Sequence, residues 1–165
     1  MKRLILLGVM LIILFSFISA SICSGEKVIK GFNTNGRYVS DYHTSLTCVN
    51  LPIGVTLGET VSYESSTVPS CNATYPVAIG ISPSSQTDNY EFTEITCAKV
   101  VNANVGAITN YLPDGESHMC ASGKYLYSFN CTPECNGKDV RPRCISISCN
   151  SSTEVCDGVD NDCDG

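Results

Sequence analysis

Between residues 22 and 153 the chain alternates short apolar segments with polar, turn-forming ones, and no apolar period of 3.6 residues persists. Ser, Thr, Val, Tyr, Asn and Gly are frequent in this stretch, as in strands joined by turns. Asn-Gly or Asp-Gly dipeptides at 35–36, 114–115 and 136–137 fall between the strand candidates, where hairpins and loops need such residues. The pattern predicts an all-β protein.

The cysteines recur in two series at intervals of 47 to 49 residues: Cys23, Cys71 and Cys120, and Cys48, Cys97 and Cys144. Such a regular interval indicates a threefold internal repeat of about 48 residues. Each unit begins with a cysteine and an apolar strand, at 28–32, 77–81 and 125–129, and ends with a second cysteine. We expect one disulfide within each unit, namely Cys23–Cys48, Cys71–Cys97, and Cys120 with either Cys144 or Cys149.

The first 21 residues have the order typical of a secretory signal peptide. Lys2 and Arg3 precede an apolar run over 4–18, and the small residues Ser19, Ala20 and Ser21 follow it. Cleavage after Ser21 places small residues at both recognition positions. The apolar run is shorter than the roughly twenty residues that span a bilayer, so no membrane span is expected after cleavage. An uncleaved anchor is the alternative.

Eleven cysteines behind such a leader indicate an oxidising compartment and a disulfide framework. We therefore expect a secreted or cell-surface protein with a cysteine-rich β-repeat domain over 22–150. Because eleven is odd, one cysteine stays free, pairs between chains or pairs with a residue beyond Gly165. We favour the last of these alternatives, because the acidic motif at the end of the chain is also unfinished.

Charge narrows the choice of partner. Beyond residue 21 the chain has sixteen acidic and eight basic residues, a net charge near −8. This balance argues against nucleic acid as a partner. Five of the acids lie between Glu154 and Asp164, so much of the acidity is local to the end of the chain.

This acidic segment has the spacing of a cation-binding loop. From Asp160 the pattern is D-x-D-x-D-G, which places Asp160, Asp162 and Asp164 at loop positions 1, 3 and 5. Asp157 is a further candidate ligand. Ca²⁺ takes roughly six to eight oxygen ligands, so we expect the remaining ligands beyond Gly165. The segment predicts a metal site that this stretch of chain does not complete.

Two cysteines, Cys156 and Cys163, bracket the carboxylates. A disulfide between them would hold the mutually repelling side chains together without metal. The alternative is an acidic turn between bonded cysteines that binds no ion.

Residues 154–165 resemble the MopE-type metal-binding motif, whose pattern E-x-C-D-G-x-D-N-D-C-D-G they match at every position. The acidic spacing is also similar to that of thrombospondin type 3 repeats. The resemblance implies an extracellular metal-binding module over these residues only. Its family name suggests copper, but carboxylate oxygens without imidazole form a hard ligand set, which favours Ca²⁺ over Cu²⁺.

The three cysteine-bounded units resemble the three-unit β-prism of vitelline membrane outer layer proteins, in which similar repeats pack about a pseudo-threefold axis. The resemblance implies a β-prism or similar architecture and a carbohydrate-facing role. The alternative is that three cysteine-stapled β units serve as a stalk or spacer.

Other candidate chemistry is weaker. Cys131, Cys135, Cys144 and Cys149 have spacings that a tetrathiolate zinc site could use, although disulfides explain the same residues. His43 and His118 stand in no recognisable catalytic motif, so no enzyme is expected. A soft copper contact by His118 and Met119 is the alternative for the second histidine. Asn72, Asn130 and Asn150 stand in N-x-S/T sequons and are glycan acceptors if the host glycosylates.

Two functional hypotheses follow. In the first, the chain is a secreted or cell-surface structural protein with a calcium-type loop at residues 154–165. In the second, it is an extracellular module that binds a glycan or a protein surface, and the acidic loop is a structural tail. Exposed tyrosines would then be the contact candidates: Tyr38, Tyr42, Tyr63, Tyr90 and Tyr111.

Overall fold

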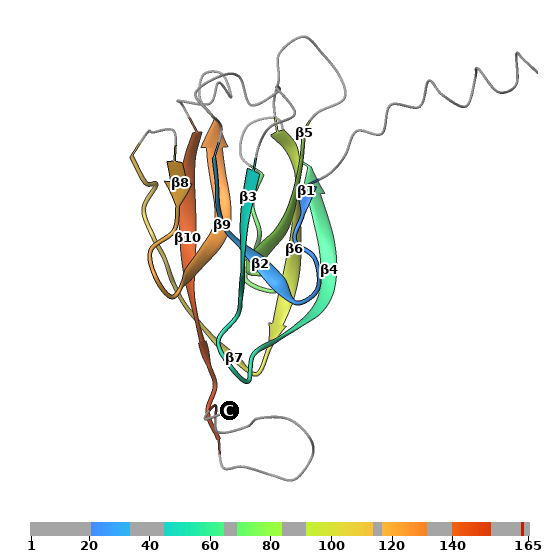
Figure 1. The fold of residues 1–165 in the computed structure, drawn as a ribbon, viewed down its shortest axis with the longest axis vertical. Coiled ribbons are helices and arrows are strands. Elements are labelled where there is room, and N and C mark those ends of the chain that lie inside the picture. The colour runs from blue at the N-terminus through green and yellow to red at the C-terminus, as the bar shows by residue number, and fades with distance from the viewer. Residues whose placement is uncertain are drawn as a thin grey trace, which may run out of the picture.

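The computed structural model describes residues 21–33, 45–64, 69–83, 92–113, 117–131, 140–152 and Cys163. Within these ranges the chain forms strands and no helix, which confirms the all-β prediction (Figure 1). The strands are β1 Ser21–Ile22, β2 Lys27–Asn33, β3 Ser45–Asn50, β4 Thr56–Glu64, β5 Val77–Pro83, β6 Phe92–Val101, β7 Ala103–Ile108, β8 Ser117–Met119, β9 Lys124–Cys131 and β10 Val140–Cys149. Residues 1–20 of the predicted signal peptide lie outside the described ranges. No helix among the described residues is long and apolar enough to cross a membrane.

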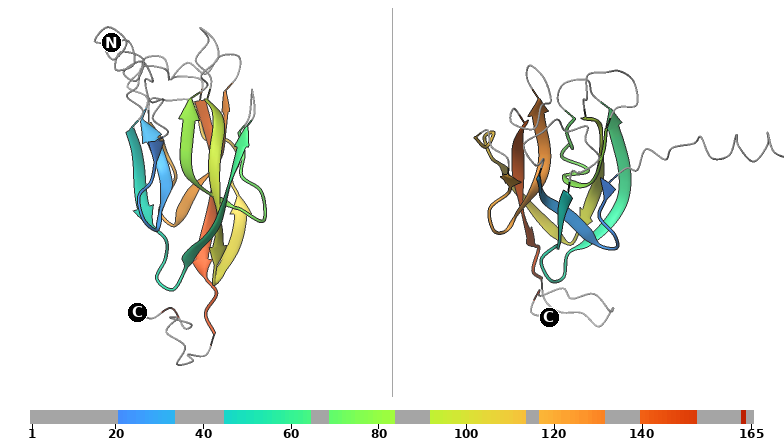
Figure 2. Two further views of the ribbon diagram at one scale, coloured as in Figure 1. Left: turned by 90° about the vertical axis from the view of Figure 1, so that its right-hand side faces the viewer. Right: turned by 45° about the horizontal axis from the view of Figure 1, so that its top comes forward.

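The strands form three antiparallel sheets. One sheet has four strands in the order β1-β5-β6-β4, and the other two have the orders β7-β10-β9 and β3-β2-β8. Each sheet is built on two strands that follow one another in the sequence: β5 with β6, β9 with β10, and β2 with β3. Figure 2 shows these three pairs from two further directions. The predicted apolar segments 28–32, 77–81 and 125–129 lie in β2, β5 and β9.

A common interior joins the three sheets. One buried cluster draws on β2, β5, β6 and β9, with Phe32, Ile95, Leu126 and Phe129 all fully buried. The rings of Phe32 and Phe129 meet edge to face at 5.9 Å between centroids. A second cluster contains Val28, Val77, Tyr125 and Ile145 together with other buried residues. Apolar burial of this kind is the main favourable contribution to folding.

Each strand pair contains a β-bulge beside a cysteine. The registers shift between Ile29 and Gly31 in β2, between Ala78 and Gly80 in β5, and opposite Tyr127 in β9. Side chains alternate between the faces of a regular strand, so residues three apart face opposite sides. The extra residue restores a common face. As a result, three pairs of residues separated by three positions lie in the same buried cluster: Ile29 and Phe32, Ala78 and Ile81, and Leu126 and Phe129.

Three disulfides clamp the strand pairs: Cys23–Cys48, Cys71–Cys97 and Cys120–Cys144, with Cα–Cα distances of 5.7, 5.6 and 5.8 Å. The first two pairings confirm the prediction, and the third selects Cys144 as the partner that the sequence left open. The sequence separations are 25, 26 and 24 residues. Each bond joins a cysteine that precedes the first strand of a pair to a cysteine within the second strand of that pair. Cross-links of this length restrict the unfolded chain and so stabilise the fold.

Backbone hydrogen bonds connect the three pairs in a closed cycle. The amide of the leading cysteine in one pair donates to the carbonyl of the bulged residue in another: Cys23 N to Ile79 O at 2.8 Å, Cys71 N to Tyr127 O at 3.0 Å, and Cys120 N to Lys30 O at 3.0 Å. The first pair thus binds the second, the second binds the third, and the third binds the first. Bulges leave a residue outside the ladder of their own pair, and here its carbonyl accepts from a neighbouring pair.

The residues directly before the leading cysteines pair with strands of the neighbouring pairs. Ile22 pairs with Gly80, Met119 pairs with Gly31, and Ser70 makes an isolated bridge with Ser128. A Cβ on Gly80 would approach Ile22 Cγ1 to 2.8 Å, and one on Gly31 would approach Met119 Cα to 2.8 Å. Both positions therefore need glycine because another chain segment passes closely.

Candidate functional site

The sequence places the candidate metal site immediately after β10. Its candidate ligands, Asp157, Asp160, Asp162 and Asp164, lie outside the described residues, as does Cys156. Around them the structure describes the end of β10, residues 150–152 and Cys163. The described part of the site is therefore the attachment of the acidic segment to the β body.

A fourth disulfide makes this attachment. Cys163 is bonded to Cys149, the last residue of β10, with a Cα–Cα distance of 6.2 Å and a sequence separation of 14. The predicted pairing of Cys163 with Cys156 is therefore wrong. Sequence proximity favoured Cys156, whereas the sulfur bonded to Cys163 is that of Cys149 at the end of β10. The bond encloses the candidate ligands Asp157, Asp160 and Asp162 in one loop that starts and ends at the end of β10.

Three asparagines fix Cys149 to the β body. Asn102, between β6 and β7, has a φ of 55°, a conformation that Asn tolerates better than most residues. Its carbonyl accepts a hydrogen bond from Asn150 N at 3.1 Å, and its side chain donates to Gly54 O at 3.1 Å. Asn104 donates through Nδ2 to Cys149 O at 3.3 Å. The anchor of the acidic segment is thus held by β6, β7 and the link between β3 and β4.

Sequence reasoning did not identify this asparagine set as part of the site. Asn102 is the corner at which the chain passes from the four-stranded sheet into the sheet of β10. Its only local signal is the asparagine itself, a residue type that is frequent in turns. The role of Asn102 depends on Gly54 and Asn150, which are 48 residues away in each direction.

No other metal site is formed by the described residues. Within those ranges no group of three or more His, Cys, Asp or Glu side chains could hold a metal ion. The tetrathiolate zinc alternative is wrong, because Cys144 is bonded to Cys120 and Cys149 is bonded to Cys163. Oxidised sulfurs have no thiolate to offer a metal.

The structure does not bring His118 and Met119 together as the copper alternative expects. His118 is buried, with its ring 4.9 Å from that of Phe32 between centroids, whereas Met119 is 38% exposed. Successive side chains of a strand point to opposite faces, so β8 directs these two apart. His43 lies outside the described residues.

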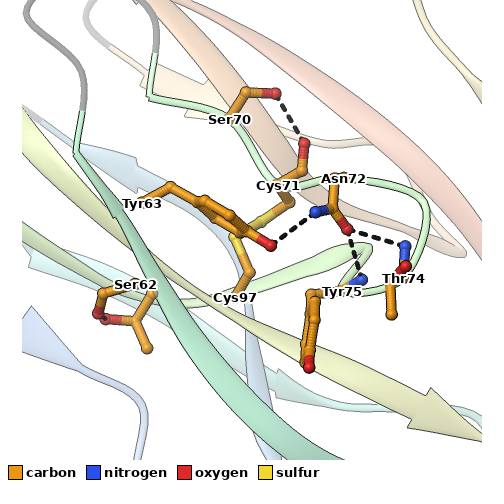
Figure 3. The surroundings of a disulfide bond; sticks show 9 residues. Ser62, Tyr63, Ser70, Cys71, Asn72, Thr74, Tyr75 and Cys97 are labelled. Atoms are coloured by element: carbon orange, nitrogen blue, oxygen red, sulfur yellow. Dashed lines mark hydrogen bonds between the residues drawn. A yellow bond between two sulfur atoms is a disulfide. The ribbon is translucent and has the colours of Figure 1, made fainter.

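The sequon residue Asn72 has a structural role beside the Cys71–Cys97 disulfide (Figure 3). Its Oδ1 accepts from the backbone amides of Thr74 at 2.8 Å and Tyr75 at 2.9 Å, an Asx-type turn that leads toward β5. Its Nδ2 donates to Tyr63 Oη at 2.6 Å and so joins this turn to β4. The nitrogen that would accept a glycan is therefore the donor that links the turn to Tyr63 of β4.

The asparagines of the other two sequons differ in their exposure to solvent. Asn130 is half-buried in β9, whereas Asn150 is exposed beyond β10. Of the five candidate contact tyrosines, Tyr63 and Tyr111 are described. Tyr111 is exposed, and the Arg143 guanidinium lies over one face of its ring, 5.2 Å from the centroid. Tyr38, Tyr42 and Tyr90 lie outside the described residues.

No protein-family model matches the chain, and no curated protein or solved structure matches it. Function must therefore be inferred from the chain's own residues. The described features that bear on function are an oxidised β body and a disulfide that ties the acidic segment to the end of β10.

Proposed function

We propose that the protein is a secreted or cell-surface structural protein, in which a disulfide-stapled β body presents a calcium-binding loop at the end of β10. The observation that carries this proposal is the Cys149–Cys163 disulfide, which encloses most of the spaced carboxylates and attaches them to a rigid strand. Four disulfides among the described residues suit an oxidising, extracellular compartment.

The body, in this proposal, consists of three copies of one unit arranged about a pseudo-threefold axis, as in a β-prism. Three observations support it. The three disulfides have nearly equal loop lengths, each strand pair has a bulge beside its cysteine, and the interpair hydrogen bonds form a closed cycle. Three disulfides and a closed cycle of hydrogen bonds restrict the chain, which suits a scaffold better than a device that changes shape.

In the loop, Asp160, Asp162 and Asp164 supply the alternating carboxylates, and Asp157 adds a further oxygen ligand. Crowded carboxylates repel one another, so the loop is disfavoured in the absence of a cation. Bound Ca²⁺ supplies the compensating charge, and its binding free energy stabilises the ordered loop. Closure by Cys149–Cys163 reduces the conformational entropy that the loop loses when it binds the ion.

Native mass spectrometry and calorimetry of the secreted, oxidised protein test the proposal, with Ca²⁺, Cu²⁺ and EDTA in parallel. We expect a single Ca²⁺ adduct that EDTA removes and that Asp160→Asn and Asp162→Asn weaken at least tenfold. Glu59→Gln on the exposed face of β4 is the control, because it removes one carboxylate outside the loop. Equal Ca²⁺ affinity in the wild type and both aspartate variants would overturn the calcium assignment.

The role of the disulfide has its own test. Cys149→Ala/Cys163→Ala leaves every carboxylate in place but releases the loop from β10. We expect weaker Ca²⁺ binding, by about three- to tenfold, because an unclosed loop loses more entropy on binding. If this double variant bound Ca²⁺ as tightly as the wild type, the attachment to β10 would have no part in the site.

A further inference from the structure

The four described disulfides differ in their exposure to solvent. In each of the three bonds that clamp the strand pairs, the leading cysteine is buried: Cys23 is 5% exposed, and Cys71 and Cys120 are each 3% exposed. In Cys149–Cys163, by contrast, both cysteines are only half-buried. Thiol–disulfide exchange requires a thiolate to reach a disulfide sulfur. Of the described bonds, Cys149–Cys163 is therefore the best placed for exchange with an external thiol.

The Cys149–Cys163 bond also lies outside the framework that holds the β body together. Each clamp joins a cysteine before one strand to the strand paired with it, whereas this bond joins the end of β10 to a residue beyond it. Other contacts hold Cys149 in place: it pairs with Ala103 of β7, and its carbonyl accepts from Asn104. Opening of the bond would therefore release Cys163 and leave β10 in its sheet.

A side-chain amide contacts one of the two sulfurs. Asn102 Nδ2 donates to Cys149 Sγ at 3.7 Å. The same nitrogen donates to Gly54 O at 3.1 Å, which fixes the position of the amide. A hydrogen bond stabilises a thiolate, and a more stable thiolate leaves faster during exchange. The contact thus favours Cys149 as the leaving sulfur and Cys163 as the sulfur that is attacked.

We propose that Cys149–Cys163 is a site of thiol–disulfide exchange, at which an external dithiol opens the acidic loop while the β body stays folded. Exposed disulfides of secreted proteins are commonly the labile and regulatory ones. Cys163 stands between Asp162 and Asp164 in the sequence, so an uncharged dithiol suits this site better than an anionic thiol such as glutathione.

The exchange takes place in two steps. A thiolate of the dithiol attacks the Cys163 sulfur, the bond to Cys149 breaks, and Cys149 leaves as a thiolate that accepts from Asn102 and then takes up a proton. The second thiolate of the dithiol attacks its own sulfur in the mixed disulfide and releases Cys163, which is protonated in turn. The dithiol is oxidised to a cyclic disulfide, and the protein gains two electrons and two protons.

One consequence rests on the proposed function, in which the closed loop binds Ca²⁺. Reduction of Cys149–Cys163 should weaken Ca²⁺ binding by the same factor of about three to ten that is expected for Cys149→Ala/Cys163→Ala. Linkage is reciprocal, so saturating Ca²⁺ should favour the disulfide by that factor. The reduction potential should fall by about 15 to 30 mV, because a tenfold change in a two-electron equilibrium corresponds to about 30 mV.

Timed reduction of the folded, full-length protein tests the site itself. Free thiols are first blocked with iodoacetamide, dithiothreitol is added, and new thiols are labelled with N-ethylmaleimide after an acid quench and located by peptide mass mapping. We expect Cys149 and Cys163 to be labelled at least tenfold faster than the cysteines of the three clamps. The circular dichroism of the β-sheets should not change over the same period, and glutathione at equal thiol concentration should react more slowly.

Two asparagine variants test the role of Cys149 as the leaving sulfur. Asn102→Gly keeps the positive φ and removes the donor to Cys149 Sγ, so exchange should slow by about threefold, the effect of one ordinary hydrogen bond. Asn104→Ala is the matched control, because it removes a donor to the carbonyl of Cys149 and none to its sulfur. Equal slowing in both variants would assign the effect to a loosened anchor and contradict the role of Asn102.

Two outcomes of the labelling would overturn the inference. Equal rates for all four disulfides would show that Cys149–Cys163 has no special access. Labelling that appears only together with loss of the β-sheet signal would show that reduction requires unfolding of the body.

Redox titration in dithiothreitol buffers, with and without saturating Ca²⁺, separates this inference from the proposed function. A shift of three- to tenfold toward the disulfide in Ca²⁺ would support both. Selective reduction with equal Ca²⁺ affinity in the oxidised and reduced forms would overturn the regulatory consequence. Selective reduction of a protein that binds no Ca²⁺ in either form would refute the calcium loop, while the exchange site would be supported by the labelling rates.

Discussion

The pair β5–β6 and the pair β2–β3 begin from the same local pattern and end in different surroundings. Both have a leading cysteine bonded across the pair, a bulge beside the second cysteine and a glycine where another strand passes. β6 is covered by β4, whereas β3 is at an edge. The local pattern thus determines the clamp, and the neighbouring strands determine how deeply it is buried.

The difference affects how much each pair contributes to the stability of the fold. A pair with strands on both sides has its apolar side chains removed from water and its backbone groups bonded, so it contributes more to folding. In the edge pair, Leu46 and Cys48 are only partly buried and no described strand pairs with the other side of β3, so this pair contributes less. Substitutions at matched positions of the two pairs measure this contrast directly.

The largest effect should come from removing the clamps. Loops of 25 and 26 residues predict nearly equal entropic losses of about 3.5 kcal/mol for Cys23→Ala/Cys48→Ala and Cys71→Ala/Cys97→Ala. The second pair should cost about 1 kcal/mol more, because removal of the fully buried Cys97 sulfur leaves a cavity. Urea unfolding of both variants measures the difference. Equal losses would show that burial adds nothing to the clamp.

The next largest effect should come from shortening apolar side chains, which should cost the two pairs different amounts of stability. Ile95→Ala in β6 removes a fully buried side chain and should cost about 3 to 4 kcal/mol. Leu46→Ala, the matched position in β3, should cost about 1 to 2 kcal/mol, because its side chain is partly exposed in the folded state. Thermal and urea unfolding provide the comparison. A cost for Leu46→Ala as large as that for Ile95→Ala would contradict the role assigned to the partial exposure of Leu46.

A smaller loss of stability is expected at Asn102. At this residue β6 connects directly to β7 in the neighbouring sheet, whereas β3 connects to β4 through residues 51–55. Asn102→Gly keeps the positive φ but loses the bond to Gly54 O, a cost of about 1 kcal/mol. Asn102→Ala adds strain of about 1 kcal/mol in the left-handed region. Unfolding of the two variants side by side is the measurement. The reverse order would contradict the assigned backbone role.

The smallest effect concerns pH. Tyr125 in β9 occupies the position that the buried valines Val28 and Val77 occupy in β2 and β5. Burial raises the pKa of Tyr125 above its ordinary value of 10.0. Above about pH 10 the unfolded tyrosine ionises while the buried one stays neutral, so stability should fall as pH rises. Tyr125→Phe should be less sensitive over that range. Identical pH profiles in urea unfolding would refute the assignment.

Much of the body could be predicted from the sequence, because its signals are local. Strands at 28–32, 77–81 and 125–129 follow from apolar runs between turns, and Cys23–Cys48 and Cys71–Cys97 follow from their spacing. The bulges could not be predicted, because nothing in a single strand indicates where the partner strand skips a residue. They decide which residues face the interior.

The candidate site was predicted less well. The acidic spacing is a local feature and remains the basis for the calcium proposal. The cysteine that anchors it was wrongly predicted, since Cys156 is close to Cys163 in sequence and Cys149 is close to it in space. The burial of His118 and the partial exposure of β3 were also missed, because burial depends on strands distant in the sequence.

The sequence by itself determined the strand class, the regular cysteine framework and the acidic motif, because each depends on residue type and short-range spacing. Only the tertiary structure decided which sulfur Cys163 bonds, which carbonyls accept from Cys23, Cys71 and Cys120, and which described strands pair on both sides. These features arise when segments far apart in the chain compete for the same space and the same hydrogen-bonding groups, and that competition is settled only in the folded molecule.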